Sequence, residues 1–394
     1  MNMPISYVLV TPYTIAKSRT GGVLSRLLSR TDLELVGAQM ILPDQTFATE
    51  YADILRRQEN PEDITLLADY VEKELAPSGG RRYRTLLLLF RGEDPWGKLV
   101  KICGHIHPEQ HANADTMSGE TIRDTYADLI VSPDDPGKVT YFEPAVITPR
   151  NQRHMEEDFQ VFLKFLKGQP NIIRNIEYPE PEKIEQTLVI IKPDNWIHPS
   201  SKPGTIIDIF SRTGLRIVGL KVHRFSLEQA LEFYGPVEGA LRKKLAPIYG
   251  GKARELLEKE FDISLDESDE KTLLEIIGTK YAQDQFRRII KYMSGTRPEE
   301  CPPEQAGDPG AVMCLILFYE GENAINKIRD VLGPTDPLKA PGGTVRREFG
   351  SNVMENTAHA SDSRESVERE KNIVKINENS LEAIIRTYLE HRYA

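Results

Sequence analysis

One histidine, His359, stands among small and hydroxyl residues in the run from Asn356 to Ser363. An unperturbed imidazole is largely neutral at physiological pH, so it can attack a phosphorus atom without first losing a proton to another base. The small neighbours leave room for a phosphate group to approach. Taken alone, a histidine of this kind more often caps a helix or packs against one, so its role depends on which residues lie near it.

Cationic and hydroxyl side chains fall at predicted ends of strands and helices in the same half of the chain. They are Lys192, Arg329, Thr335 and Arg346. Arginine forks bind phosphate oxygens bidentately and lysine adds a compact charge, and both offset the charge that spreads over a phosphoryl group during its transfer. Two arginines and a lysine converging on one histidine predict a polyphosphate substrate.

The elements that must position these residues occur twice. The run from Ser29 to Gly37 is echoed from Ser211 to Gly219. Further landmarks recur in the same order: Val8–Pro12 with Val189–Pro193, Leu87–Phe90 with Leu315–Phe318, Gly92–Gly104 with Gly321–Gly333, and Gly119–Arg123 with Gly342–Arg346. Several landmarks in one order over most of both halves indicate a duplicated domain.

Each copy has the predicted order strand, helix, strand, further helices, strand, helix and then the motif loop. Thr187–Ile191 is short, apolar and β-branched, as a buried central strand is, and Gly214 is placed to end the helix before the second strand. This order predicts an α+β protein with two ferredoxin-like, split βαβ domains, each an antiparallel sheet covered by helices.

The expected domain boundaries follow from the repeat and from composition. They are a first domain at residues 1–149, a helical linker at 150–185, and a second domain at 186–394 that contains an insertion at about 235–280 with helices near 253–261 and 271–277. The second domain is expected to close with an amphipathic helix around Leu381, Ile385 and Leu389, capped by Asn379 and Glu382.

Composition excludes several classes of function. The 394 residues are 39% hydrophobic, which is enough for buried cores, and the net charge of −10 with no dense basic tract argues against a nucleic-acid partner. No run of about 18 apolar residues predicts a membrane span, and Met1 to Ser6 does not resemble a secretory leader. Three scattered cysteines predict neither disulfides nor a zinc site, so we expect a cytoplasmic protein.

The second copy resembles a nucleoside diphosphate kinase. The matching segments are Val189–Asp194, Phe233–Tyr234, Lys291–Met293, Leu332–Pro337, Gly343–Arg346 and Asn356–Ser363, with Glu365, Ser366 and Glu370 beyond them. The resemblance implies a ping-pong reaction in which His359 takes the γ-phosphate of a nucleoside triphosphate and passes it to a nucleoside diphosphate. Glu370 and Ser361 would position the imidazole.

The same resemblance implies the remaining site residues. Phosphates and sugar would be held by Lys192, Tyr234, Arg329, Thr335, Arg346 and Asn356. Mg²⁺ would be carried by the nucleotide phosphates, with Asp362 as a candidate partner through water. The family's base-stacking aromatic aligns with Gln285, and Phe286 beside it is the candidate replacement. Relatives form symmetric oligomers, so we expect a homo-oligomer in which the fused copies make an internal pseudo-dimer.

The first copy keeps the scaffold and loses the chemical groups. Thr11 stands at the place of Lys192, Val100 at that of Arg329, and Ile106 near that of Thr335, whereas Arg123 remains opposite Arg346. Pro136 aligns with His359, and the nearby His105, His107 and His111 precede Gly119 instead of following Arg123. The first copy is therefore expected to be a degenerate domain without the nucleophile.

Three functional hypotheses follow from these residues. The leading one is a nucleoside diphosphate kinase with one active site per chain. The alternative is a nucleotide-binding regulatory or scaffold protein with little turnover, in which the insertions block exchange. A third is a histidine phosphocarrier or protein kinase that delivers phosphate to another protein. Turnover with ADP and GTP separates the first from the second.

Overall fold

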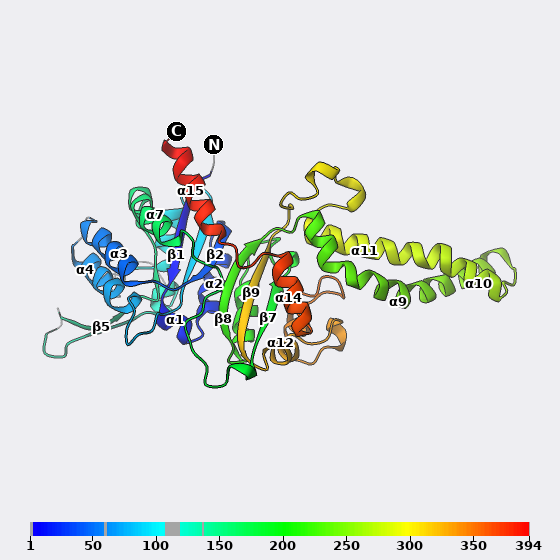
Figure 1. Cartoon of the computed structure of the whole chain (residues 1–394), viewed down its shortest axis with the longest axis horizontal. Helices are drawn as coiled ribbons and strands as arrows, with labels where there is room; N and C mark the ends of the chain where they lie inside the picture. The colour runs from blue at the N-terminus through cyan, green and yellow to red at the C-terminus, as the bar shows by residue number, and fades with distance from the viewer. Residues whose placement is uncertain (1–2, 59–60, 107–118, 136–137, 394) are drawn as a thin grey trace. The chain divides into compact units, whose positions relative to one another are not determined.

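The computed structural model describes residues 3–58, 61–106, 119–135 and 138–393. The chain forms two compact units, and His223–Cys314 with Asn372–Val374 make up the second. The first unit holds the bulk of two four-stranded sheets, one from each copy of the repeat (Figure 1). Among the described residues, no helix combines the length and apolar character needed to cross a bilayer.

The first copy's sheet has the strand order β6-β1-β3-β2. Its strands are β1 (Ile5–Val10), β2 (Glu34–Ile41), β3 (Thr85–Arg91) and β6 (Val146–Ile147). The pairs β1–β3, β2–β3 and β1–β6 are antiparallel. Every residue of β1 is buried, and the helices α5 and α7 contact the strand. Tyr7 and Leu9 share one face because alternate residues of a strand do.

Helices and a separate hairpin complete the first copy. The helices are α1 (Pro12–Ala16), α2 (Thr20–Arg30), α3 (Gln45–Arg57), α4 (Pro61–Tyr70) with the π-helical turn η1 (Val71–Leu75), α5 (Pro95–Cys103) and α6 (Ile122–Tyr126). The hairpin pairs β4 (Asp128–Val131) with β5 (Val139–Glu143). It lies between α6 and the edge strand β6, where the sequence repeat predicted only a loop.

The second copy's sheet has the corresponding order β10-β7-β9-β8. Its strands are β7 (Ile184–Ile191), β8 (Arg216–His223), β9 (Cys314–Glu322) and β10 (Ala358–Ala360). The shared order and antiparallel pairing confirm the predicted fold class of two ferredoxin-like domains. One expectation was wrong: His359 lies on the edge strand β10, and not in a loop, because three residues are too few to show the alternation that marks a strand.

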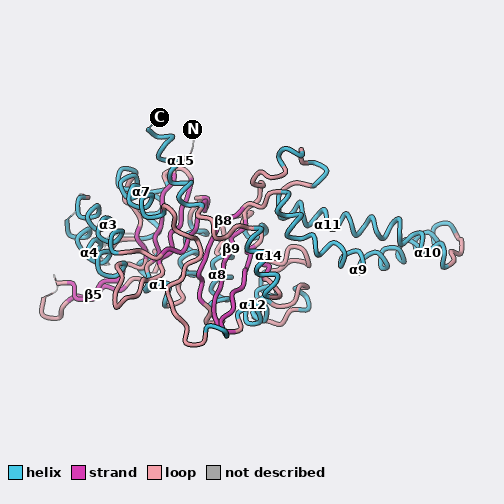
Figure 2. The backbone as a smooth tube through the Cα atoms, in the orientation of Figure 1, coloured by secondary structure: helices cyan, strands magenta, loops and turns pink. Residues whose placement is uncertain are grey.

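The second copy has its own set of helices. They are α8 (Lys202–Ser211), α12 (Ala324–Leu332), α13 (Val345–Phe349) and α14 (Arg364–Ile373), with short 3-10 turns η3 (Pro181–Lys183), η4 (Pro193–Asn195) and η8 (Pro337–Lys339). Gly214 has φ of +69°, so it makes the left-handed turn predicted for the chain after α8. Figure 2 shows α12 and α14 beside the strands of this sheet.

Two helices outside the repeat pack into the first copy. The linker helix α7 (Gln152–Leu166) and the helix α15 (Ser380–Tyr393) contact each other. Leu381, Ile385 and Leu389 of α15 are buried in one hydrophobic cluster with Tyr7 and Phe159. The oxygen of Asn379 accepts from the backbone N–H of Glu382 at 3.2 Å, as the predicted cap requires.

The two copies meet through α2 and α8. A Cβ on Gly204 would lie 2.3 Å from both the carbonyl oxygen of Gly21 and the backbone nitrogen of Ser25. The Ser25 hydroxyl donates to the carbonyl oxygen of Ser201 at 3.0 Å. Glycine on both helices thus permits an approach in which backbone touches backbone.

The second unit is dominated by a long helical hairpin. It runs through α9 (Leu227–Phe261), α10 (Glu267–Leu273), the π-helical turn η5 (Leu274–Gly278) and α11 (Thr279–Ser294), and α9 and α11 lie side by side (Figure 1). The 3-10 turns η6 (Pro298–Glu300) and η7 (Pro303–Gln305) follow. The insertion was predicted as separate short helices, but α9 continues through Pro236 and Pro247, which ordinarily interrupt a helix.

Candidate active site

His359 is held by residues from the strand it occupies and from the following helix. On β10 it pairs with Ile190 of β7, and its side chain is 23% exposed. Its Nε2 lies 3.0 Å from Oε2 of Glu370 on α14. The Ser361 hydroxyl, two residues further along the same face, donates to that same oxygen at 2.6 Å.

Glu370 fixes the imidazole through one carboxylate oxygen. The residue is 3% exposed, so its carboxylate depends on these donors and on Arg369, whose guanidinium lies 3.5 Å from the other oxygen. A carboxylate can only accept, and Nε2 must therefore carry the proton that it shares with Glu370. The lone pair of the neutral ring then resides on Nδ1, which is the atom able to act as a nucleophile.

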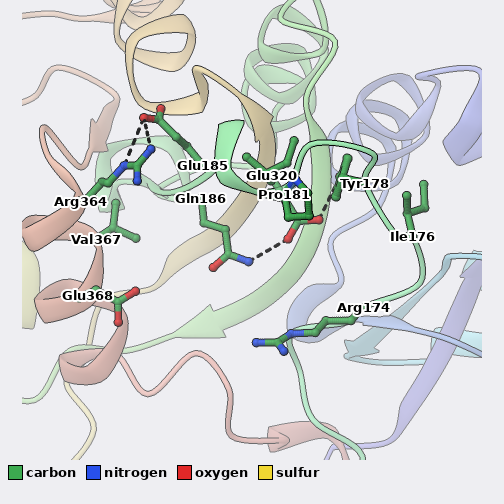
Figure 3. A pocket seen from close by; sticks show the side chains of 11 residues that line it. Arg174, Ile176, Tyr178, Pro181, Glu185, Gln186, Glu320, Arg364, Val367 and Glu368 are labelled. Atoms are coloured by element: carbon green, nitrogen blue, oxygen red, sulfur yellow. Dashed lines mark hydrogen bonds and ion pairs between the residues drawn. The ribbon is translucent and has the colours of Figure 1, made fainter.

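The helix that carries Glu370 is tied to the start of β7. Arg364 on α14 donates to Oε1 of Glu185 at 3.1 Å (Figure 3). Oε2 of Glu185 accepts from the backbone N–H of Ile325 on α12 at 3.4 Å. The adjoining hollow of about 450 Å³ contains a second set of internal bonds, from Tyr178 and Gln186 to Glu320. These contacts position α12 and α14 on one strand.

Lys192 and Asn356 form a buried pair beside the histidine strand. Lys192 follows the last residue of β7, and its Nζ lies 2.7 Å from Oδ1 of Asn356 and 3.3 Å from the carbonyl oxygen of Met354. Lys192 is 9% exposed and Asn356 is 1% exposed. The amide nitrogen of Asn356 donates to the carbonyl oxygen of Thr335 at 3.0 Å, which joins the predicted Thr335 loop to this pair.

Arg346 on α13 holds the backbone that leads into the histidine strand. Its guanidinium donates to the carbonyl oxygens of Gly333 at 2.9 Å and Ala358 at 3.0 Å. Ala358 immediately precedes the histidine, so the arginine fixes the backbone of β10. A guanidinium can hold two separate carbonyl oxygens at once because its N–H groups project from a rigid plane.

Arg329 and Asp362 lie in the same electrostatic environment as His359. The Ser366 hydroxyl, 2.6 Å from Asp362, together with the charge of Arg329, lowers the pKa of the Asp362 carboxyl. Arg329 lies in the last turn of α12 with an exposed side chain, and Thr335 is exposed as well. The structure thus brings together eight predicted residues in the first unit: Lys192, Arg329, Thr335, Arg346, Asn356, His359, Ser361 and Glu370.

Tyr234 and Phe286 belong to the second unit. Tyr234 on α9 is 8% exposed and its ring centroid lies 5.0 Å from that of Phe233. Phe286 is 7% exposed on the face of α11 that also buries Ala282, Ile290 and Met293. That spacing is typical of helix packing, so Phe286 has a structural role of its own in the hairpin.

Two residues that position the site were not predicted. Asn195 is 3% exposed, and its amide donates to the carbonyl oxygens of Lys192 at 2.9 Å and Thr357 at 2.8 Å. Thr357 has φ of +76°, a left-handed conformation that is costly for a β-branched residue. The only signal in the sequence was the place of Asn195 three residues after the lysine.

The site contains no ready-made metal cage. Across the part of the chain that the structure describes, no three His, Cys, Asp or Glu side chains are grouped to hold an ion. Asp362 alone supplies a carboxylate of lowered pKa near the histidine.

The first copy repeats backbone hydrogen bonds that shape the site in the second copy. The backbone N–H of Thr11 donates to the carbonyl of Ala145 at 3.1 Å, as that of Lys192 does to Thr357 at 2.9 Å, and Ala145 also has positive φ. Arg123 donates to the carbonyls of Gly104 and Val146, which correspond to Gly333 and Ala358.

This correspondence corrects one predicted alignment. Val146 pairs with Val10 as Ala358 pairs with Ile191, so the next residue, Ile147, occupies the place of His359. The prediction that Pro136 holds that place was wrong, because the β4–β5 hairpin shifts the edge strand along the chain; Pro136 itself lies outside the described residues. His107 and His111 also lie outside them, and His105 is exposed after α5.

Comparison with known proteins gives this geometry a family. The family model described as nucleoside diphosphate kinase matches residues 185–242 and 305–379, and most of the hairpin falls between these two segments. A nucleoside diphosphate kinase of Bdellovibrio bacteriovorus is 30% identical over 187 residues, which are 48% of this chain and 89% of the relative. This chain belongs to the nucleoside diphosphate kinase family.

Other nucleoside diphosphate kinases match over the same share of the chain. The Staphylothermus marinus enzyme is 30% identical over 190 residues, which are 48% of this chain and 92% of the relative. A solved structure of the Aquifex aeolicus nucleoside diphosphate kinase is 25% identical, covers 50% of this chain and 98% of its own, and superposes with a TM-score of 0.31. Within this family, the described site residues are candidates for a phosphotransfer centre.

Proposed function

We propose that this protein is a nucleoside diphosphate kinase that works through a phosphohistidine at His359. The observation that carries the proposal is the shared oxygen of Glu370, which accepts from both His359 and Ser361 and so leaves the lone pair on Nδ1. Membership of the family supports the same reaction.

The reaction would proceed in two balanced steps. Nδ1 attacks the γ-phosphorus of a nucleoside triphosphate, the N–P bond forms, and the bond to the bridging oxygen breaks with its electron pair leaving on the diphosphate. A terminal phosphate oxygen of a second nucleoside diphosphate then attacks the same phosphorus and the N–P bond breaks, which restores His359. Throughout, Nε2 keeps its proton and donates it to Glu370, whose carboxylate stabilises the positive ring of the intermediate.

The substrate would be the Mg²⁺ complex of the nucleotide, since the cation neutralises the charge of the phosphate oxygens. Lys192, Arg346 and the exposed Arg329 would hold those oxygens, and Thr335 and Asn356 would bind the terminal phosphate or the sugar. Asp362 would meet the cation through water. Tyr234 and Phe286 are proposed as nucleotide-binding residues on the resemblance to the family alone.

The two copies are proposed to act as an internal pseudo-dimer within a homo-oligomer. The supporting observation is the close contact of α2 and α8 at equivalent positions of the repeat. In this arrangement the first copy has no nucleophile, because Ile147 stands where His359 does, and each chain would carry one active site.

Labelling with γ-³²P-ATP tests the proposed reaction. The wild-type chain is expected to acquire acid-labile, alkali-stable label and to lose it when GDP is added, with GTP as the product. His359→Ala should abolish labelling and exchange, whereas His391→Ala, an exposed histidine on α15, should leave both unchanged. A His359→Ala chain that still exchanges phosphate refutes the proposal, and label that GDP does not remove points to a phosphocarrier.

A further inference from the structure

The first copy has a threonine bound to a buried carboxylate where the second copy has a lysine. In the second copy the residue after the central strand is Lys192, and its ammonium contacts Asn356. In the first copy the equivalent residue is Thr11, whose hydroxyl donates to Oε1 of Glu143 at 2.6 Å. The second copy thus has a positive ammonium group at this place, and the first copy has a carboxylate beside it.

Glu143 is built into the fold and does not simply lie at its surface. It is 3% exposed, its Oε1 also accepts from the backbone N–H of Ala145 at 3.1 Å, and its Oε2 accepts from the hydroxyl of Tyr70 at 2.7 Å. A buried carboxylate repels phosphate and attracts a cation strongly, because little water screens it. A nucleotide bound here as in the second copy would place its phosphates against this charge.

A cavity of about 480 Å³ opens beside this carboxylate. That size is typical of sites for small molecules. Aromatic rings form much of its wall: Tyr13, Tyr70, Tyr83, Tyr141 and Phe142. The rings of Tyr70 and Phe142 meet nearly edge to face, with centroids 6.0 Å apart at 84°.

The charges around the cavity favour the same kind of ligand. Asp69 and Glu74 line it together with Glu143, and Lys73 is the single basic side chain among the described lining residues. Lys73 is already paired with Glu74 at 3.0 Å. The ring of Tyr13 already has two cations near it: Lys17 Nζ lies 5.4 Å from the ring centroid and the Arg19 guanidinium 5.8 Å.

We propose that this cavity in the first copy binds a small organic ammonium ion instead of a nucleotide. The ammonium would lie against Glu143 and the face of Tyr70, and the carbon chain or ring of the ligand would pack against Tyr141 and Phe142. The copy that lost the phosphotransfer groups thus has a ligand site of opposite charge preference. This inference does not depend on the reaction at His359.

Three probes of nearly equal shape test the charge preference by calorimetry on the full chain. Tyramine carries an ammonium, 4-ethylphenol is neutral, and 3-(4-hydroxyphenyl)propionate is an anion. Tyramine is expected to bind one site per chain at least about tenfold more tightly than 4-ethylphenol, with no binding of the anion. Equal binding of the first two probes, tighter binding of the anion, or no saturable binding of tyramine at millimolar concentration each overturn the proposal.

Variants locate the binding in this cavity. Glu143→Gln should weaken tyramine binding at least about tenfold, and Glu93→Gln, an exposed glutamate of the same copy, should not weaken it. Tyr141→Ala provides a second variant at a ring that is 42% exposed, where folding is little affected, and it should also weaken binding. Unchanged binding in both cavity variants refutes the assignment.

Discussion

One oxygen of Glu370 accepts from both His359 and Ser361. We therefore expect the charge of this side chain to matter more for the reaction than its length. Glu370→Gln keeps the length of the side chain and removes the charge that stabilises a phosphorylated, positive imidazole. We expect the rate of His359 labelling by γ-³²P-ATP to fall by roughly 10²-fold, and Ser361→Ala to reduce it by a smaller factor. Rapid-quench measurement of the first turnover gives these rates.

Glu368→Gln is the matched control for this prediction. Glu368 lies on the same helix, with a side chain 62% exposed and paired with Lys371, so its variant should label at the wild-type rate. Equal rates for Glu370→Gln and Glu368→Gln would show that the carboxylate does not position or stabilise the imidazole.

At the residue scale, the sequence allowed prediction of side chains that belong to a motif but not of those that shape the backbone. Lys192, Asn356 and Glu370 were predicted together, and the structure places them around one strand end. Asn195 and Thr357 were missed. A threonine with positive φ cannot be predicted from its type, since threonine ordinarily avoids that conformation and only the surrounding bonds enforce it.

Among elements, the contact of α2 with α8 gives the sharpest prediction. Gly204→Ala would place a Cβ 2.3 Å from backbone atoms of α2, which cannot move as a flexible side chain can. We expect a loss of roughly 1–3 kcal/mol in stability, seen as a lower midpoint in thermal unfolding followed by circular dichroism.

Gly239→Ala is the corresponding control in a helix interior. A Cβ at Gly239 would meet nothing within 4 Å, so alanine should leave the midpoint unchanged or raise it slightly through its better helix propensity. A Gly204→Ala chain that unfolds at the wild-type temperature would show that the two helices are not held at this distance.

Element length decided which parts of the fold could be predicted. Central strands such as β7 and β9 were found because their apolar runs are long, whereas β6 and β10 have two and three residues and show no period. The β4–β5 hairpin displaced β6 from the position that the repeat suggested, and α9 runs through two prolines because the rest of its turns support it. Both errors came from local rules that longer-range packing overrides.

Across the molecule, the buried carboxyl of Asp158 predicts how stability depends on pH. Burial raises its pKa to about 8, although the Tyr7 hydroxyl donates to it at 2.8 Å. Because the folded pKa lies above the unfolded value of about 3.9, the folded state holds a proton that the unfolded state releases. The stabilisation is complete below about pH 4 and is lost as the pH rises toward 8, and Glu143, whose pKa burial also raises, acts with the same sign.

Asp158→Asn should therefore flatten this profile. The wild-type unfolding midpoint is expected to fall by roughly 5 °C or more between about pH 5 and pH 8, and the asparagine variant should lose much of that decline. Glu157→Gln, at a side chain that is 44% exposed, removes only a lesser contribution to the raised pKa of Asp158, so it should retain most of the decline. Parallel profiles for the wild type and Asp158→Asn would show that the carboxyl is ionised throughout.

The helix α15 shows what amphipathic patterning can predict and what it cannot. Its apolar face was expected to be buried, and it is, but in the core of the first copy instead of beside the motif that precedes it in sequence. Nothing in a single amphipathic stripe identifies its partner surface.

That placement has a consequence for synthesis. A ribosome releases β1 and α3 long before it reaches Leu381, Ile385 and Leu389, the side chains that close over Tyr7 in the same core. The first copy must therefore wait, with apolar surface uncovered, until the whole second copy has emerged, although domains made earlier usually fold earlier. The copy that is translated first is therefore the copy whose core is completed last.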